Sequence, residues 1–294
     1  MVWGIDIGGT KLEGVVLESA SSATPIARER IDTEAEQGYE HILSRTAELL
    51  KILKSKSGTS PSVIGVGHPG ATDTFTGLLK NSNTTALNGK PFISDLEKTL
   101  GLDVRSANDA NCFTLAEAKL GAAKGFDIVF GVILGTGVGG SIFVSGKIIQ
   151  GRHGIAGEWG HNVLDPQGVT CYCGKRGCVE TVLSGPGLEK FYALHANKSM
   201  KLEDIAATAN TDQIAARTLD RLYDHFGNAI ASVVNILDPD CIILGGGVSN
   251  IEGLYTRGRE AILPHLFNDR FDAPILKHSL GDSAGVFGAA LLTA

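Results

Sequence analysis

The sequence predicts an α/β protein built from two similar halves, and three observations support that prediction. The chain has 294 residues, enough for two ordinary domains. Short apolar runs of strand length alternate with segments in which apolar residues recur at helical spacing. An apolar run, a glycine-rich turn and a second apolar run open the chain, and the same arrangement recurs after residue 127. We therefore expect an internal structural duplication.

The first half is predicted to begin with a β-hairpin. Val2–Ile7 and Leu12–Leu17 are both apolar and lie on either side of a short turn. The turn consists of Gly8, Gly9, Thr10 and Lys11. The pattern therefore favours strand, turn and strand over strand followed by helix.

Helices and strands should alternate through the rest of this half. Apolar residues recur at helical spacing over residues 42–53, which predicts a helix. Short strands are expected over 63–67 and 103–107. Between them, Ser94 and Glu97 have the spacing of a capping box and should open a short helix.

The second half starts with a hairpin whose turn matches the pattern G-x-G-x-x-G. Apolar residues 128–134 and 141–144 flank the turn, Gly135–Gly140. A dinucleotide-binding Rossmann unit needs a helix after such a turn, whereas a strand follows here, so we reject that interpretation. There is no Walker A sequence either. A pair of such turns can direct backbone N–H groups at phosphates, although one alone is more often just a tight hairpin.

A long amphipathic helix dominates the remainder of the second half. Apolar residues recur over 219–237, and Asp238–Pro239 should end the helix. The buried strand 241–244 then leads into a third glycine cluster, 245–247. Residues 281–290 are typical of a turn followed by a C-terminal helix of small residues.

Composition excludes several classes of partner. The net charge is −6 and no block of Lys or Arg is present, so we expect no nucleic-acid partner and no attraction to anionic membranes. No apolar stretch approaches the roughly 20 residues that cross a bilayer, and no signal peptide is evident. A cytoplasmic, soluble protein is expected. Glycine, at 38 residues, is nearly twice as frequent as the average of about 7%, which suggests several close backbone approaches.

Four motifs together resemble the ROK family of bacterial sugar kinases and repressors. They are Asp6–Lys11, Leu134–Gly140, Gly157–His161 and Cys171–Cys178. The resemblance covers essentially the whole chain. It implies an actin/hexokinase-like fold of two RNase H-like domains, with ATP and sugar meeting in the interdomain cleft.

The predicted domains are residues 1–108, joined by the C-terminal helix 282–294, and residues 109–281, which include the cysteine loop. No low-complexity linker separates the halves, so the boundary should act as a hinge.

The resemblance also assigns the nucleotide site. Asp6 would help to hold hydrated Mg²⁺, the two glycine turns would embrace the phosphates of ATP, and the third cluster would lie against the adenosine. The residues assigned to ATP in this way are Asp6, Gly8, Gly9, Thr10, Lys11, Gly135, Thr136, Gly137, Gly245, Gly246 and Gly247.

The same resemblance makes Asp109 the catalytic base that orients the sugar hydroxyl and accepts its proton. From the residues alone, Asp109 would more often be the N-cap of the helix that follows it. Sugar hydroxyls are assigned to Asn108, Glu158, His161 and Glu180. Taken singly, the two glutamates would usually be solvated surface residues, and Trp159 is expected in the core.

Three cysteines lie within eight residues and point to a metal. Cys171, Cys173 and Cys178, together with His161, form a Cys₃His set, which is the ligand chemistry of a closed structural zinc site. Four protein ligands leave no open position, so the zinc should shape the loop rather than take part in the chemistry. The other two cysteines are expected to be small buried residues.

We expect transfer of the γ-phosphate of ATP to the 6-hydroxyl of a hexose. Several separated segments resemble the fructokinase/mannokinase branch, which predicts D-fructose or D-mannose. N-acetylglucosamine kinase and glucokinase are the alternatives, and residues 68–73 or 81–92 would have to leave room for an N-acetyl group. A sugar-sensing transcriptional regulator is disfavoured, because the first motif begins too near the N-terminus for a DNA-binding segment. A homodimer is expected by family analogy.

Overall fold

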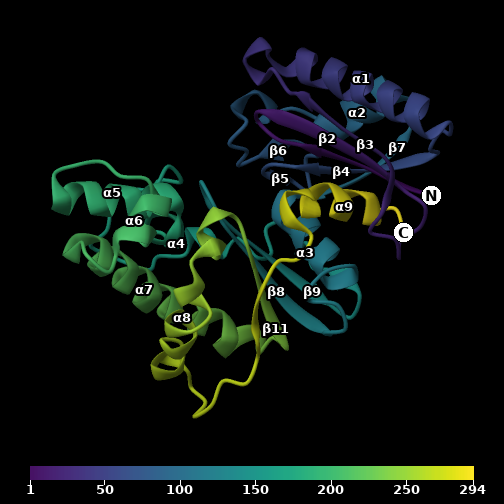
Figure 1. Ribbon diagram of the computed structural model, residues 1–294. Helices are drawn as coiled ribbons and strands as arrows, with labels where there is room; N and C mark the ends of the chain where they lie inside the picture. The colour runs from purple at the N-terminus through teal and green to yellow at the C-terminus, as the bar shows by residue number, and fades with distance from the viewer. The chain divides into compact units, whose positions relative to one another are not determined.

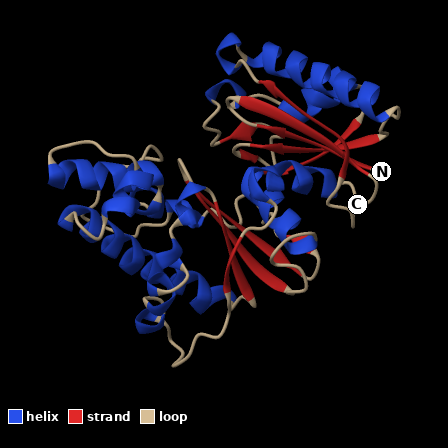
Figure 2. Ribbon diagram, viewed as in Figure 1, coloured by secondary structure: helices blue, strands red, loops and turns tan.

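Two five-stranded sheets organise the chain, and the computed structural model describes all of residues 1–294 (Figures 1 and 2). The first sheet has the order β3-β2-β1-β4-β7 and the second has the order β10-β9-β8-β11-β12, while β5 and β6 form a small separate ladder. The strands are β1 (Val2–Ile7), β2 (Lys11–Leu17), β3 (Pro25–Asp32), β4 (Val63–His68), β5 (Ala71–Thr72), β6 (Leu79–Lys80), β7 (Asp103–Asn108), β8 (Ile128–Leu134), β9 (Val138–Val144), β10 (Lys147–Ile148), β11 (Cys241–Gly245) and β12 (Ile275–Lys277). The helices are α1 (Tyr39–Ser57), α2 (Phe92–Leu100), α3 (Asp109–Lys119), α4 (Val179–Leu183), α5 (Gly185–Ala196), α6 (Leu202–Thr208), α7 (Gln213–Leu237), α8 (Arg257–Glu260) and α9 (Ala284–Leu291).

The topology of the two sheets confirms the predicted duplication. In each half the first strand is central, its hairpin partner and a third strand lie on one side, and two later strands lie on the other. In the first sheet β4 pairs parallel to β1 and β7 pairs parallel to β4. In the second sheet β11 pairs parallel to β8 and β12 pairs parallel to β11. Both halves therefore share one topology, in which three consecutive strands are followed by two later strands that pair parallel to the first strand and to each other.

The chain divides into two compact units whose boundary differs from the predicted one. The first unit contains residues 1–125, 142–156 and 279–294, and the second contains 126–141 and 157–278. The sequence predicted a boundary at residues 108 and 109, but α3 packs against α9 and so groups with the first unit. The physical reason is that packing contacts, rather than position along the chain, determine the unit to which a helix belongs.

Helices cover both faces of the first sheet. Helix α1, together with α2, packs on one face, and α9 and α3 pack on the other (Figure 1). The buried residues of α1 are those that the helical spacing predicted, and the helix ends at Gly58 in the left-handed conformation (φ 67°). Helix α9 lies so close to the sheet that a side chain on Gly4 or Gly65 would collide with its backbone.

The predicted capping box of α2 is wrong. The helix begins at Phe92 after Pro91, so Ser94 lies inside it and caps nothing. Instead, the Glu97 carboxylate accepts a hydrogen bond from the Val104 N–H at 3.3 Å. Fully buried Phe92 anchors the start of the helix, because its packing outweighs the energy of about 1 kcal/mol that a side-chain cap contributes.

The second unit packs a helical layer around α7. The Asp212 carboxylate caps this 25-residue helix, accepting hydrogen bonds from the N–H groups of Ile214 (2.8 Å) and Ala215 (3.1 Å). The helix ends before Asp238–Pro239, as predicted, and α4, α5, α6 and α8 pack against it. None of the helices combines the length and apolar character that a membrane crossing requires.

Candidate active site

Thr33 anchors the first glycine turn through two hydrogen bonds, and most residues of the turn are exposed to solvent. Buried Thr33 donates its Oγ1–H to the Gly8 carbonyl at 2.7 Å and its N–H to the Thr10 carbonyl at 2.9 Å. Gly9, Thr10 and Lys11 are exposed. Two hydrogen bonds from one anchor residue therefore fix a turn whose outer face remains available to a ligand.

Asp6 lies near the end of β1, half-buried in a space that two glycines leave open. A methyl group on Gly67 would lie 2.9 Å from one Asp6 carboxylate oxygen, and one on Gly285 would lie 2.6 Å from the other. Burial, and then the charges of Asp109 and Glu13, raise the pKa of Asp6 to about 7. Such a carboxylate would be stabilised by a nearby cation.

Glu13 neutralises part of this acidic region. It faces Asp6 across the β1–β2 ladder and is only 6% exposed. Its carboxylate accepts hydrogen bonds from Arg28 Nε at 2.5 Å and from Arg30 Nε at 3.1 Å. A buried carboxylate with two arginine partners is well compensated, and the Arg30 charge also lowers the pKa of Asp6 somewhat.

Asn108 and Asp109 lie at the junction of β7 and α3. The N-cap is Asn108, whose Oδ1 accepts the N–H of Asn111 at 3.1 Å, so the alternative prediction that Asp109 caps the helix is wrong. Asp109 is the first helical residue and stays accessible, with one carboxylate oxygen 2.8 Å from the Ala110 N–H. Neighbouring protein atoms reduce the solvation of the carboxylate and raise the pKa of Asp109, although the residue stays exposed, and the N–H of Ala110 partly offsets this rise.

The second glycine turn is fixed by a different set of groups. Glu180 accepts the N–H of Val138 at 3.0 Å, and a methyl group on Gly137 would lie 2.6 Å from the same Glu180 oxygen. The Gly185 N–H donates to the Gly135 carbonyl at 2.9 Å. Glu180, predicted to bind a sugar hydroxyl, therefore also supports the turn through one carboxylate oxygen.

The third glycine cluster lies beside this second turn. Gly246 has φ 80°, and any side chain there would collide with the carbonyl of Leu134 at the end of β8. The Ser249 hydroxyl donates to the Gly246 carbonyl at 2.6 Å. The structure thus brings Gly135–Gly137 and Gly245–Gly247 together within the second unit, although more than a hundred residues separate them in the chain.

Glu158 precedes a short 3₁₀ turn, Trp159–His161, and His161 is its last residue. Trp159 is 4% exposed and donates its indole N–H to the Gly139 carbonyl at 3.2 Å, which confirms its predicted core position. Glu158 is partly exposed immediately before the buried indole. The turn therefore ties the second hairpin to the segment that carries both polar residues.

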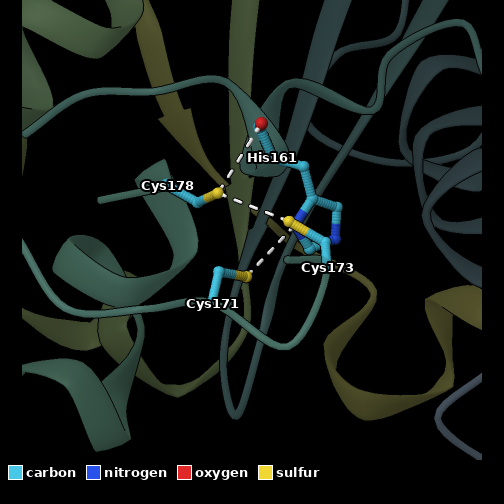
Figure 3. Close-up of side chains that lie close together, drawn as sticks. All are labelled: His161, Cys171, Cys173 and Cys178. Carbon is cyan, nitrogen blue, oxygen red and sulfur yellow. Dashed lines mark hydrogen bonds between the residues drawn. The ribbon is translucent and has the colours of Figure 1, made fainter. Parts of the chain in front are cut away.

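The four predicted zinc ligands converge (Figure 3). Their ligand atoms all lie within 4.8 Å of one another, with 3.6 Å between the Sγ atoms of Cys173 and Cys178 and 3.6 Å between Cys171 Sγ and His161 Nδ1. Zinc–sulfur bonds of about 2.3 Å in a tetrahedron would separate sulfur atoms by roughly 3.8 Å. The donor set therefore fits a Zn²⁺ ion.

The other ring nitrogen of His161 points away from the cysteines. Its Nε2 lies 3.1 Å from the Tyr172 hydroxyl, and the two rings meet edge to face. A histidine that ligates a metal commonly uses its second nitrogen in this way, because the hydrogen bond fixes the ring orientation.

Sequence reasoning missed several residues that shape these sites. Thr33 follows β3, Gly67 lies within β4, and Gly285 lies in the first turn of α9. No local sequence pattern therefore marks these residues as parts of a site. The only available signal was the excess of glycine, which indicated close approaches without locating them.

Comparison with known proteins defines the family. The family model described as "ROK family" matches residues 2–294. The chain belongs to the ROK family. This confirms the resemblance carried by the four sequence motifs.

Curated relatives within the ROK family match over their full length. The chain is 34% identical to an N-acetyl-D-glucosamine kinase of Histophilus somni (strain 129Pt), with 99% of this chain and 98% of the relative covered. It is 36% identical to an N-acetyl-D-glucosamine kinase of Aliivibrio fischeri (strain ATCC 700601 / ES114), with 99% of each covered. The chain is therefore homologous to ROK sugar kinases.

Solved ROK structures confirm the predicted fold class. A ROK hexokinase from Thermus thermophilus superposes with a TM-score of 0.88 at 31% identity, covering 99% of this chain and 97% of that one. A ROK family glucokinase from Streptomyces griseus, solved with glucose and AMPPNP, superposes with a TM-score of 0.81 at 28% identity, covering 98% and 97%.

Proposed function

We propose that this protein is an ATP-dependent kinase that phosphorylates the 6-hydroxyl of N-acetyl-D-glucosamine. The observation that carries the substrate is the full-length similarity to N-acetyl-D-glucosamine kinases, at 34% and 36% identity. The predicted preference for D-fructose or D-mannose receives no support from these relatives, which favour the alternative. Segments that resembled the fructokinase/mannokinase branch could not decide this, because the choice between such sugars depends on one or two groups.

Asp109 is proposed as the base. Asn108 supplies the helix cap, so the Asp109 carboxylate is not needed for that purpose and stays accessible at the N-terminus of α3. The helix dipole favours the ionised form at this position. As the bond from the sugar oxygen to phosphorus forms, a carboxylate oxygen of Asp109 accepts the hydroxyl proton. With its Oδ1 engaged as the cap, Asn108 would offer its amide N–H to a neighbouring hydroxyl.

Asp6 is proposed to hold hydrated Mg²⁺ near the phosphates. When bound, the ion neutralises charge on the transferring phosphoryl group. The fit is supported by the acidic surroundings of Asp6, whose pKa is raised by burial and by Asp109 and Glu13, and by the space beside Gly67 and Gly285. The exposed N–H groups of Gly9 and Thr10 would then bind phosphate oxygens.

The second unit is proposed to supply the remaining contacts. Gly135, Thr136 and Gly137 would bind phosphate, and Gly245–Gly247 would lie against the adenosine. Glu158 and Glu180 would bind sugar hydroxyls, because each buried hydroxyl needs a partner. His161 would bind zinc through Nδ1, and its Nε2 would exchange the Tyr172 hydroxyl for a sugar hydroxyl. The Cys₃His set would hold a structural zinc that keeps the segment around His161 in place. A homodimer stays a prediction.

A coupled kinase assay over a panel of sugars tests the proposal. With saturating Mg-ATP, kcat/KM should be highest for N-acetylglucosamine, compared with glucose, mannose and fructose. A clear preference for fructose or mannose would restore the original prediction. Turnover with no sugar in the panel would contradict the kinase assignment.

A further inference from the structure

A small polar pocket of about 190 Å³ lies wholly within the first unit, beside the proposed base. Its wall comes from the end of β4, the β5 strand, the β7–α3 junction and the segment 150–154. The polar residues that line it are His68, Thr72, Thr74, Ser106, Asn108, Asn111 and Gln150. Because Asn108 precedes Asp109, a ligand whose hydroxyl reaches the base could extend into this pocket.

Thr72 has a hydroxyl that the protein itself does not use. Its Oγ1 is buried and has no hydrogen-bond partner, although the residue lines the pocket. Buried hydroxyls in native proteins are almost always paired, since desolvation without a partner is costly. The unpaired hydroxyl of a residue that lines a pocket is available to a group bound there.

His68 adds an acceptor, because its hydrogen-bond partner favours one tautomer of the ring. The residue is 1% exposed, and its Nδ1 lies 3.3 Å from the Pro69 carbonyl, which can only accept. Burial lowers the pKa of His68 to about 4, so the ring is neutral at physiological pH. With the proton on Nδ1, the Nε2 atom is an acceptor.

Small residues supply the apolar part of the wall. Ala71 and Ala107 line the pocket, and so does Gly154, which has φ 70°. A methyl group on Gly154 would lie 2.8 Å from the Thr72 carbonyl oxygen, so the glycine lets the segment 150–154 approach β5 closely. At about 30 Å³ per water, the pocket holds roughly six waters, and a group of four heavy atoms fits easily.

We propose that this pocket binds the 2-acetamido group of the sugar, with Thr72 and His68 as its specificity-determining residues. The inference rests on the proposed function and locates its selectivity. The Thr72 hydroxyl donates to the acetamido carbonyl, His68 Nε2 accepts the amide N–H, and the methyl group lies against Ala71 and Ala107. A 2-hydroxyl is too short to satisfy both polar partners, so glucose leaves one of them unpaired. Of the two segments that the sequence left open, this selects residues 68–73.

The test compares two sugars in two variants of one residue. Thr72→Val keeps the shape of the side chain but removes the hydroxyl, and Thr72→Ser keeps the hydroxyl. We expect Thr72→Val to lower kcat/KM for N-acetylglucosamine at least tenfold, mainly through KM, while kcat/KM for glucose stays within about twofold. Thr72→Ser should retain most of the wild-type discrimination. Thr99→Val is the matched control, because Thr99 is exposed on α2, its hydroxyl donates to the Asp95 carbonyl, and it lies outside the pocket.

The outcomes separate this inference from the proposed function. Equal losses for both sugars would place the sugar ring, not the acetamido group, in the pocket, and no loss for either would remove Thr72 from the site. Both results would overturn the inference and leave the kinase assignment standing. A wild-type enzyme that prefers glucose to N-acetylglucosamine would overturn the proposed substrate itself. A thermal melt of each variant shows whether it is folded, and Thr72→Val should melt no lower than wild type, because it loses only an unpaired hydroxyl.

Discussion

The two glycine hairpins have the same backbone plan but carry different chemistry. β1 and β2 are joined by Gly8–Thr10, and β8 and β9 by Gly135–Gly137, so each turn has three residues and begins with glycine. Aligned on their glycines, Asp6 of the first hairpin corresponds to Ile133 of the second. The duplicated fold therefore repeats the three-residue glycine turn, while the acidic residue two positions before it, Asp6, occurs only in the first half.

The supports of the turns differ as well. Thr33, from the segment after β3, holds the first turn through two hydrogen bonds. The second turn is held by Glu180 and Gly185, which follow the cysteine loop. In each half, the turn is therefore held by residues that lie in or follow other strands or helices of the same half. The comparison supports the proposal that the first unit supplies the base and the cation site, and the second unit supplies hydrogen bonds and the structural zinc site.

The largest expected effect tests whether the chemistry belongs to the first unit. Asp109→Asn should lower kcat about 10³-fold, because the amide keeps the shape of the side chain but cannot accept a proton. The KM for the sugar should change little. Steady-state kinetics with Mg-ATP and N-acetylglucosamine measure both.

Asp103→Asn is the matched control, since Asp103 is an exposed aspartate at the opposite end of β7 from Asp109. It should behave as wild type. Retention of more than roughly a tenth of the turnover by Asp109→Asn, a loss below ~1.4 kcal/mol, would mean that another group is the base.

The second prediction concerns the space around Asp6, the acidic residue whose place in the second hairpin is taken by Ile133. Gly285→Ala would place a methyl group 2.6 Å from an Asp6 oxygen and displace the carboxylate, so kcat should fall roughly 10²-fold. Alanine favours the first turn of α9 by up to about 1 kcal/mol, so the melting temperature should not fall in parallel. Kinetics and a thermal melt on the same preparation separate the two effects.

Gly258→Ala serves as the control in the second unit, because its methyl group would meet the Phe226 ring at 3.2 Å, the Leu254 side chain at 3.5 Å and the Gly253 carbonyl at 3.6 Å, and no proposed site residue. Normal turnover in Gly285→Ala would show that Asp6 needs no such clearance.

The third prediction tests the proposed zinc site of the second unit. The purified protein should contain one zinc per chain by elemental analysis, and Cys171→Ser should lose it. We expect the sugar KM to rise several-fold through the loop that holds His161, while kcat changes less. Cys241→Ala, which changes a buried cysteine outside the set, should keep its zinc. A zinc-free wild type with normal stability would reduce the Cys₃His set to a coincidence of spacing.

The smallest expected effect is on stability. Because the pKa of Asp6 is raised from its ordinary value of 3.8 to about 7 in the folded protein, the native state binds more protons than the unfolded state between these values. Asp6 therefore costs increasing stability as pH rises from about 4 to 7. Asp6→Asn, which mimics the protonated form, should stabilise the protein by about 2 kcal/mol at pH 8, since partial solvation reduces the full effect.

Denaturant unfolding at pH 5 and pH 8 checks the sign. The advantage of Asp6→Asn over wild type should be larger at pH 8. A difference that does not depend on pH, like that expected for Asp103→Asn, would show that the Asp6 carboxylate titrates normally.

The sequence predicted local structure best where short-range geometry decides it. The first hairpin, the buried face of α1 and the end of α7 at Asp238–Pro239 appear where the apolar pattern placed them. The second hairpin also forms, but its second strand starts at Val138, three residues before the predicted start at 141. The start of α2 was wrong, because burial of Phe92 outweighed the capping pattern at Ser94 and Glu97. The grouping of α3 with the first unit could not be predicted either, because it depends on packing against α9, the last helix of the chain.

For the candidate site, the sequence by itself determined which residue types are available and which of them are neighbours along the chain. The cysteine loop is one example, because its ligands lie within a few residues and a short loop brings them together. Only the tertiary structure decided that Gly67 and Gly285 leave room around Asp6, and that Thr72 lines a pocket beside Asn108. Turn geometry and metal-ligand spacing depend on a few adjacent residues, whereas burial, clearance and pKa depend on which distant segments pack against each group.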